Sequence, residues 1–466
     1  MAASAGNGSA AAPRAARGGP AVAATGFGWL LLYLVVGLTP LVIALTADPP
    51  PGRAFWLEFS VALGFIGLAM LGAQFAIVSR FSAVNAPFGL DVVLNFHRGI
   101  SFVAFAFVLA HPAIIVIRDP DLLRLLNPVT AHWTARFGLI SVAALIALIV
   151  TSVWRKRLGI PYEVWRVLHG VLAVTVVIAA LVHIERVGHY VDGPWKRGFW
   201  ILMSAAFVVL LANVYFVQPL RQRNRPWEVV SVEPERGSSW TLTIRPVGHR
   251  GIRFAPGQFA WIRVNRSPSS VREHPFSFSS SADRDDDGAS PAGGGTVAFT
   301  IAEAGDFTSR LGDLEPGDRV HLDGPYGVFS FERNEGPRFV FLAGGIGISP
   351  IMSMLRTLAD RGDKRPCLLL YGNPAWDDVT FREELEAMRD RLDLTVVHVL
   401  EQPPEGWTGE TGFIDDDLLD RHLGDHPERA RYFVCGPPPM TEAVLGALAR
   451  HGIPDRHVDL EIFDLV

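Results

Sequence analysis

Two pairs of histidines lie inside long apolar stretches of the sequence. Both pairs are fourteen residues apart: His97 and His111 in Val92–Ile117, and His169 and His183 in Val164–His183. At about 100° and about 1.5 Å per residue, an α-helix places the two members of a pair near one face and about 21 Å apart along its axis. A single histidine in such a stretch is often a packing residue that bonds a neighbouring helix. Two pairs with identical spacing instead predict axial ligands for two stacked b-type haems.

Six apolar stretches are long enough to cross a bilayer, which takes about 20 residues of helix. They are Phe27–Thr46, Phe55–Val78, Val92–Ile117, Phe137–Trp154, Val164–His183 and Phe199–Val217. Hydrophobic residues form 49% of the 466-residue chain and charged residues only 19%, as expected for a protein with a membrane portion. The first stretch exceeds a signal-peptide core, so we take it as a span. Residues 1–25, rich in Ala and Gly, are expected to be a disordered tail.

The distribution of arginines orients these spans. Six spans return the chain to the side from which it started, and the clusters Arg155–Arg157 and Arg221–Arg225 mark that side as cytoplasmic. The third and fifth spans then run in the same direction, which puts the histidines at two levels of the bilayer. The inner level has His97 and His169, and the outer level has His111 and His183. The expectation is an integral protein of a bacterial inner or plasma membrane with cytoplasmic termini.

Charge and cysteine content exclude several classes of function. The net charge of −5 argues against nucleic acid as a partner. The only two cysteines, Cys367 and Cys435, are far apart in the sequence. They cannot form a four-cysteine iron–sulfur cluster or a cysteine zinc site, and they are compatible with a reducing compartment.

The sequence changes character after Arg225. From Trp227 to about Phe331 it shows short alternating stretches with Gly, Pro and Asp between them, which predict a small antiparallel β-barrel. From Arg338 onward, buried strands alternate with amphipathic helices, which predicts a doubly wound α/β domain. In this second part a strand, a glycine-rich turn at Gly344–Pro350 and a helix follow one another, an arrangement that binds phosphate groups. The predicted domains are a tail (1–25), a membrane domain (26–220), a barrel (226–333) and an α/β domain (337–466).

Four motifs in the soluble half occur in an order that resembles the ferredoxin–NADP reductase superfamily. They are HPFSFSSS, GPYGVFSF, LAGGIGISP and CGPPPM. Together with the six spans and four histidines, residues 25 to 466 resemble the NADPH oxidase and ferric reductase family. The resemblance implies FAD bound to the barrel and NADPH or NADH bound to the α/β domain.

The resemblance also implies which residues contact these cofactors. For FAD, Phe276 and Ser277 would contact the isoalloxazine, His274 would lie near the phosphates, and Thr308 would cap the pyrophosphate. Many members of the superfamily have a lysine at the position of Ala302. The remaining FAD-binding residues implied by the motifs are Pro275, Ser279, Gly324 and Tyr326.

For the nicotinamide nucleotide, the resemblance implies a pyrophosphate cradle and a nicotinamide contact. The cradle residues are Gly344, Gly345, Gly347 and Pro350, and the residues near the nicotinamide are Cys435 and Gly436. Phe463, close to the C-terminus, would cover the flavin and move aside for hydride transfer. Pro374 occupies a position where NADPH-specific relatives often have arginine, and Arg382 is a possible substitute, so NADPH is slightly favoured.

These inferences predict a transmembrane oxidoreductase that passes electrons from cytoplasmic NAD(P)H through FAD and two haems to an acceptor outside. The candidate acceptors are ferric or cupric ion, dioxygen giving superoxide, a periplasmic partner protein and a quinone. Ile115 occupies a position where dioxygen-reducing members of the family can carry a second histidine, which favours the other acceptors. Arg98, Arg136 and Arg166 are expected to reach the headgroups or the haem propionates. The alternative is a haem-free membrane anchor for a flavin diaphorase.

Overall fold

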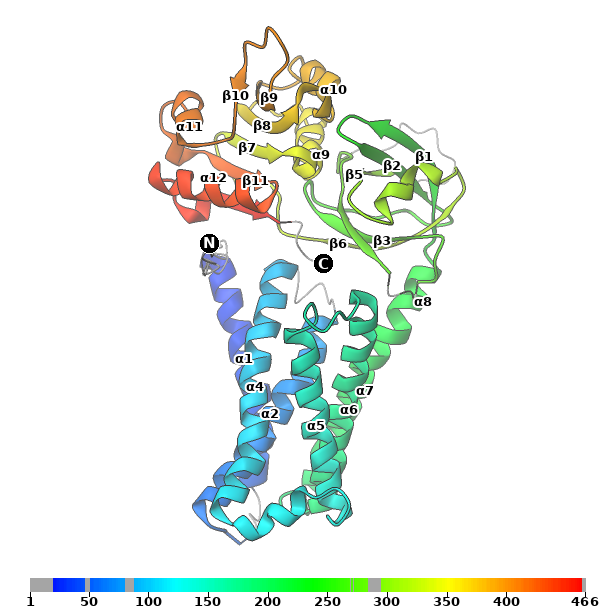
Figure 1. Ribbon diagram of the computed structural model, residues 1–466, viewed down its shortest axis with the longest axis vertical. Coiled ribbons are helices and arrows are strands. Elements are labelled where there is room, and N and C mark those ends of the chain that lie inside the picture. Colours follow the sequence, from blue (N-terminus) through cyan, green and yellow to red (C-terminus); the bar gives the residue numbers. More distant parts are fainter. Residues whose placement is uncertain are drawn as a thin grey trace, which may run out of the picture.

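Six long helices form a bundle that carries two folded units at one end (Figure 1). The computed structural model describes residues 20–46, 51–79, 88–268, 270, 272–283 and 295–462. Each helix is long and apolar enough to cross a membrane. They are α1 (Pro20–Leu45), α2 (Phe55–Val78), α4 (Leu90–Arg118), α5 (Trp133–Val153), α6 (Tyr162–Val187) and α7 (Pro194–Ala212). The predicted fold class of a six-helix bundle, an antiparallel barrel and an α/β domain is confirmed.

The ends of several helices differ from the apolar stretches in the sequence. Helix α1 starts at Pro20, inside the predicted tail, and proline suits a first helical turn because no acceptor is needed for its missing N–H. Residues 1–19 lie outside the described residues. Helix α5 starts at Trp133 rather than Phe137, since the imidazole of His132 caps it by accepting the Thr134 N–H (3.5 Å). Hydropathy alone does not detect a polar first turn of this kind.

The last span, Pro194–Arg223, contains the predicted stretch but is not regular α-helix throughout. Helix α7 stops at Ala212, and a π-helical turn (Asn213–Val217) leads into the short helix α8 (Gln218–Arg223). Pro219 in α8 has no N–H and would clash with a carbonyl one turn earlier, so regular α-helical bonding cannot continue through this point. Helix α8 therefore connects the bundle to the first strand of the barrel.

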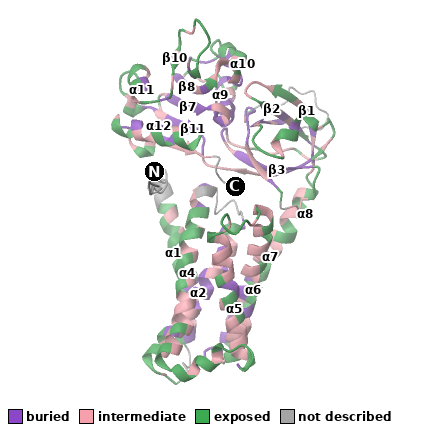
Figure 2. Cartoon of the chain, in the orientation of Figure 1, coloured by how far each residue is buried: buried purple, intermediate pink, exposed green. Residues whose placement is uncertain are grey.

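The outer faces of the bundle expose large apolar side chains. Ile201, Leu202 and Val208 of α7 are each more than 60% exposed. Figure 2 shows that buried residues are sparse in the bundle and concentrated in the two soluble units. An apolar surface of this extent is unfavourable in water and suited to lipid, where helices satisfy their own backbone hydrogen bonds.

The first soluble unit is an antiparallel barrel. Its strands are β1 (Trp227–Glu235), β2 (Ser239–Pro246), β3 (Phe259–Val264), β4 (His274–Ser277), β5 (Val297–Ala302) and β6 (Arg319–Tyr326), in the order β4-β3-β6-β1-β2-β5. A bridge between Phe278 and Phe299 links the two ends of this order. Leu242, Ile262 and Phe299 are fully buried in its core.

The second soluble unit is a parallel sheet with helices on both faces. Its strands are β7 (Phe339–Gly344), β8 (Cys367–Ala375), β9 (Leu394–Gln402), β10 (Glu410–Thr411), β11 (Arg431–Cys435) and β12 (Val458–Glu461). Their order is β10-β9-β8-β7-β11-β12, so the chain winds in one direction from β7 and then resumes on its other side at β11. The main helices are α9 (Ile348–Asp360), α10 (Arg382–Met388), α11 (Asp416–His422) and α12 (Pro438–Arg450). In such sheets ligands bind where the order reverses, here at the carboxyl ends of β7 and β11.

Helix α9 fastens this sheet to the barrel. Three polar residues at four-residue spacing lie on one face of α9: Ser349, Ser353 and Thr357. The Ser349 hydroxyl donates to the Thr300 carbonyl (2.8 Å), and the Ser353 hydroxyl donates to the Ser280 carbonyl (2.7 Å). Thr357 Oγ1 accepts the Ala282 N–H (2.9 Å). The two units are thus joined by buried hydrogen bonds rather than by surface ion pairs alone.

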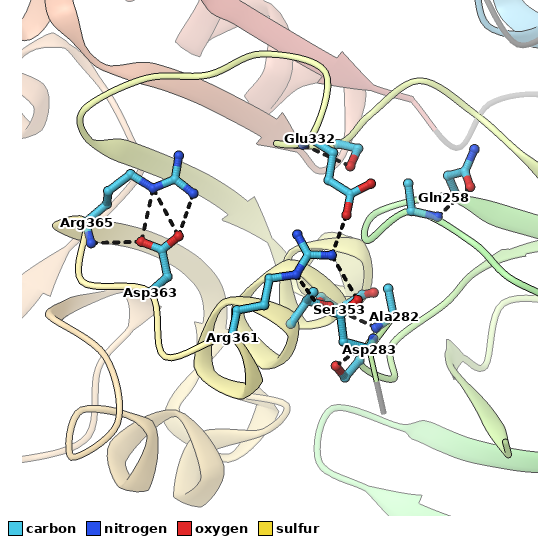
Figure 3. A network of polar contacts seen from close by, with 12 residues as sticks. Gln258, Ala282, Asp283, Glu332, Ser353, Arg361, Asp363 and Arg365 are labelled. Carbon is cyan, nitrogen blue, oxygen red and sulfur yellow. Dashed lines mark hydrogen bonds and ion pairs between the residues drawn. The ribbon is translucent and has the colours of Figure 1, made fainter. Parts of the chain in front are cut away.

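Ion pairs extend the contact between the two units beyond the carboxyl end of α9. Arg361, just beyond α9, pairs with Asp283 of the barrel and with Glu332 of the segment between the two units (Figure 3). Its guanidinium also lies over the Phe331 ring, 5.5 Å from the centroid. The contact from Ser349 to Arg361 keeps the edge of the sheet where the strand order reverses in a fixed position relative to the barrel.

Candidate functional site

The structure brings the four predicted histidines together in two levels of the bundle. His97 of α4 and His169 of α6 lie at the end near the barrel, with ring centroids 6.4 Å apart. A metal ion bound between two imidazoles places their centroids about 6 Å apart, since each metal–nitrogen bond is about 2.0 Å. His111 and His183 lie further along the same two helices and line one cavity of about 320 Å³.

Each of the four rings is oriented by a bond from its Nδ1 to a neighbouring helix. At the inner level the acceptors are side chains, Gln74 Oε1 for His97 (2.7 Å) and Ser152 Oγ for His169 (3.1 Å). At the outer level they are backbone carbonyls, Ser60 O for His111 (2.9 Å) and Thr134 O for His183 (2.8 Å). An Nδ1 bonded in this way leaves Nε2 as the metal-binding nitrogen and fixes the plane of the ring.

Two glycines make room for the outer rings. A Cβ at Gly64 of α2 would lie 3.3 Å from the His111 ring, and one at Gly138 of α5 would lie 3.2 Å from the His183 ring. The helices that carry these glycines also supply the carbonyls that hold the same two rings. The glycines therefore let each supporting helix approach its histidine closely. Nothing in the sequence pattern singled out Gly64, Gly138, Gln74 or Ser152, because their role depends on which helices become neighbours.

The outer cavity is lined almost entirely by apolar side chains, including Val108, Pro112 and Ile115 of α4. A flat, apolar macrocycle with an iron between two imidazoles fits such a lining, and the ring nitrogens supply the ligands. The residues present are consistent with haem at both levels.

Strand β4 places the predicted flavin-contacting residues on the barrel. The His274 ring stacks on Phe307 with centroids 4.4 Å apart and planes 9° apart, and Phe276 lies 6.0 Å from the same ring. Ser277 Oγ is buried and has no hydrogen-bond partner among the described residues. An unpaired buried hydroxyl is unfavourable, and a polar ring edge of a bound flavin would satisfy it.

The neighbouring strands complete this surface. Ser277 pairs in register with Phe259 of β3, which pairs in turn with Tyr326 of β6. The Tyr326 hydroxyl donates to Asp323 Oδ1 (2.8 Å), so its ring is held beside Phe259. Gly324 packs closely on β3, because a Cβ there would lie 2.8 Å from the Cβ of Ala260. Pro275 faces Trp261 across the β4–β3 pair.

Two residues predicted to contact FAD, Ser279 and Thr308, form hydrogen bonds to other protein groups through their side chains. Ser279 is fully buried, and its hydroxyl accepts the Thr300 Oγ1–H (2.9 Å). Thr308 Oγ1 accepts the N–H groups of Ala304 and Gly305 (2.8 and 2.9 Å) and so shapes the turn before it. The structure thus supports an FAD-facing role for the β4 residues more directly than for these two.

The glycine turn after β7 meets the end of β11 at the place where the strand order reverses. A Cβ at Gly347 would lie 2.2 Å from the Cys435 carbonyl oxygen. A Cβ at Gly344 would lie 2.5 Å from the sulfur of Met440 and 3.5 Å from the Gly436 Cα. The turn and the Cys435–Gly436 strand end are therefore in direct backbone contact, next to the start of α9. Gly345, with φ +52°, has open space on its outer side, and Pro350 is buried in the first turn of α9.

Burial and nearby charges keep two titratable groups neutral, Cys435 at the end of β11 and His274 of β4. Burial raises the pKa of the Cys435 thiol well above its usual value, and Glu461 adds to the shift, so the sulfur stays protonated. Burial and the nearby Arg266 lower the pKa of His274, which keeps the imidazole neutral. Neither group is set up as an acid or base. Phe463, predicted to cover the flavin, lies outside the described residues.

Comparisons with known proteins agree with this division of the chain. Residues 63–180 match the family of the ferric reductase like transmembrane component, and residues 341–445 match the oxidoreductase NAD-binding domain. The chain is 33% identical over 162 residues to NADH-cytochrome b5 reductase 1 of Cryptococcus neoformans, covering 33% of this chain and 55% of that protein. It is 28% identical over 243 residues to the reductase component of propane 2-monooxygenase from Mycolicibacterium goodii, covering 51% and 66%.

Among solved structures, the ferredoxin reductase in carbazole 1,9a-dioxygenase matches 51% of this chain and 69% of its own, with 26% identity and a TM-score of 0.44. The chain spans about half the length of the first curated relative that it matches. The two family matches cover the bundle and the parallel sheet separately. The chain thus joins a segment that matches the ferric reductase like transmembrane component to an oxidoreductase NAD-binding domain, with the antiparallel barrel between them.

Proposed function

We propose that the protein carries electrons from NAD(P)H at the barrel side of the membrane to an acceptor on the other side. The observation that carries the proposal is the placing of four histidines at two levels, each with Nδ1 held by a neighbouring helix. Bound FAD converts two-electron into one-electron chemistry, and bound haem offers one-electron sites within the bilayer. Each NAD(P)H gives two electrons to two one-electron acceptors outside, and one proton is released on the cytoplasmic side.

The residues of this chain act by binding and orienting rather than by acid–base chemistry. The Gly344–Gly347 turn and the amino end of α9 bind the nucleotide pyrophosphate, and Cys435 and Gly436 limit the position of the nicotinamide. The neutral thiol and neutral His274 add no competing proton transfer. Hydride transfer then depends on holding the nicotinamide against the ring system beside β4.

The end of β8 supports NADH as the preferred donor, against the slight preference for NADPH predicted from Arg382. The Arg382 guanidinium stacks on Trp376 (4.6 Å to the ring centroid) and donates to Glu383 Oε1 (3.1 Å), so its charge is already paired. Asp377, which follows β8, is 92% exposed. An acidic residue at this place suits a ribose hydroxyl and repels a 2′-phosphate.

For the acceptor, we propose a chelated metal ion such as ferric or cupric ion in preference to dioxygen. Ile115 lines the outer cavity at the position where dioxygen-reducing members of the resembled family can carry a second histidine. Dioxygen, a periplasmic partner protein and a quinone are the competing acceptors. Anaerobic turnover with ferric or cupric chelates separates the metal ions from dioxygen.

An anaerobic optical spectrum of the purified protein, before and after NADH or NADPH, tests the proposal. The expected result is bleaching of bound flavin together with a low-spin bis-histidine haem spectrum at about two haems per chain. NADH is expected to act at lower concentration than NADPH. Flavin bleaching without haem bands would leave a membrane-anchored diaphorase and remove the role given to the four histidines.

The inner histidines bond side chains, which a substitution can remove, whereas the outer ones bond backbone carbonyls. This difference leads to a prediction for Gln74. Gln74→Leu keeps the approximate volume but removes the acceptor of the His97 Nδ1–H, so the inner haem is expected to bind about 10- to 100-fold more weakly. Its midpoint potential is also expected to rise, because a less basic imidazole stabilises ferric iron less. Ser101→Ala is the matched control, since the Ser101 hydroxyl donates to the His97 backbone carbonyl (2.6 Å) and not to its ring. Redox titration and haem-to-protein ratios check this, and equal behaviour of the two variants would contradict it.

A further inference from the structure

Glu273, immediately before β4, is a buried carboxylate at the contact between the barrel and the bundle. Its side chain is fully buried, and Glu273 Oε1 lies 2.8 Å from Nη2 of Arg166 in α6. Its other oxygen pairs with Arg263 of β3, which is 6% exposed. One carboxylate thus joins a guanidinium of the membrane bundle to a guanidinium of the barrel.

The Arg166–Glu273 pair lies close in sequence to both ends of the proposed electron path. Arg166 precedes His169 by three residues, so the two side chains lie about one turn apart on neighbouring faces of α6. Glu273 directly precedes His274, the first residue of the strand assigned to the flavin. Two steps, the Arg166–Glu273 ion pair and the peptide bond between Glu273 and His274, therefore link the inner histidine helix to the flavin strand.

Arg263 extends the network to α8, the short helix that connects the bundle to the barrel. Its Nη1 donates to Gln222 Oε1 of α8 (2.8 Å), and its Nε donates to the Ser270 carbonyl (3.0 Å). The Gln222 carbonyl in turn lies 3.3 Å from Nδ1 of His321 in β6. The barrel is consequently attached to α6 and α8 through strands β3, β4 and β6 at once.

Buried ion pairs of this kind add little to the free energy of unfolding, but they select one arrangement of the groups that they join. Removing ions from water is unfavourable, and hydrophobic residues of similar size often stabilise a protein as well or better. A carboxylate between two guanidiniums allows only arrangements in which all three groups remain paired. A network with this property restricts how far the barrel can slide or tilt on the bundle.

We propose that Glu273 is a positioning residue for electron transfer between the flavin and the inner haem. The proposal rests on the proposed function, because it needs haem at the inner histidines. The step concerned oxidises the reduced flavin by one electron and reduces one ferric haem to ferrous, with no covalent bond made or broken. The rate of this step depends on the separation of the two groups, and Glu273 keeps that separation fixed.

The test compares Glu273→Gln with Glu163→Gln in the full-length, cofactor-loaded protein. Glu163 of α6 pairs with Arg272 at 3.8 Å, and both side chains are 42% or more exposed, so this rim pair is a matched control. In anaerobic stopped-flow with NADH, Glu273→Gln is expected to reduce flavin within about twofold of the wild-type rate and haem at least about tenfold more slowly. Glu163→Gln is expected to match the wild type in both phases.

Hydrogen–deuterium exchange provides a readout that does not depend on turnover. In Glu273→Gln, peptides covering 162–169 and 272–278 are expected to exchange faster, while those covering the α9 contact with the barrel remain unchanged. Arg166→Gln is expected to slow haem reduction to a similar extent. The double variant is expected to be no slower than either single one, because all three lose the same link.

The outcomes separate this inference from the proposed function. Wild-type haem reduction rates and unchanged exchange in both Glu273→Gln and Arg166→Gln would overturn the role of Glu273. Failure of NADH to reduce haem in the wild type, with flavin reduced normally, would instead overturn the proposed function. Slower flavin reduction in Glu273→Gln, to the same extent as haem reduction, would also count against a positioning role, since it would show general damage to the barrel.

Discussion

His97→Leu is expected to stop reduction of both haems by NADH while flavin reduction continues. His97 is one of the two inner ligands, and the other, His169, lies across from it with ring centroids 6.4 Å apart. Leucine offers no ligand atom, so the inner haem loses bis-imidazole coordination and the path to the outer level is interrupted. Electron flow to an external acceptor is expected to fall below about 1% of the wild-type rate.

A substitution of the outer ligand His111 is expected to give a different result, which shows that electrons reach the inner haem before the outer one. His111→Leu is expected to remove the outer haem but to leave the inner haem reducible by NADH. His132→Asn is the control, because His132 is an exposed cap of α5 and asparagine also caps helices well. Stopped-flow spectra at flavin and haem wavelengths distinguish these cases. Normal transmembrane transfer in His97→Leu would exclude the proposed path.

The pairing of the histidines could be predicted because it depends on rigid, local geometry. The rise and turn of a helix relate His97 to His111, and the number of spans relates this helix to the one with His169 and His183. Neither step needs knowledge of side-chain packing. The same is true of the glycine turn at Gly344–Gly347, where a strand, a turn and a helix follow one another in the sequence.

The groups that orient these residues could not be predicted, because they come from distant parts of the chain. The His111 ring bonds a carbonyl 51 residues away, and the His183 ring one 49 residues away. Backbone carbonyls have no sequence pattern at all. Glu273 and Arg166 are 107 positions apart (273 − 166), and only the docking of the barrel on α6 makes them a pair.

Gly347→Ala is expected to abolish most NADH oxidation without affecting the membrane bundle. The new Cβ would lie 2.2 Å from the Cys435 carbonyl oxygen and 2.6 Å from its carbon. These are backbone atoms of β11, which is paired with β7 along its whole length, so they cannot move without disrupting the sheet. The turn must move instead, and the pyrophosphate cradle is displaced. With an artificial dye as acceptor, kcat/KM for NADH is expected to fall about 100-fold.

Gly345→Ala distinguishes this steric cause from a general need for glycine in the turn. Gly347 has φ −59°, which any residue adopts, so only the close approach to β11 requires glycine there. Gly345 has the opposite requirement, with φ +52° and nothing within 4 Å of an added Cβ. Alanine at Gly345 therefore incurs only the left-handed strain of about 1–2 kcal/mol, and kcat/KM is expected to stay within about tenfold of the wild type.

The bundle provides an internal standard for both variants. Dithionite-reduced haem spectra are expected to be identical in Gly347→Ala, Gly345→Ala and the wild type, because the turn belongs to the α/β unit and the histidines to α4 and α6. Gly446→Ala, inside α12, controls for an added methyl group elsewhere in the same domain, where only the flexible end of Arg450 lies within 4 Å. If Gly347→Ala and Gly345→Ala were impaired equally, strain in the turn rather than its contact with Cys435 would determine nucleotide binding.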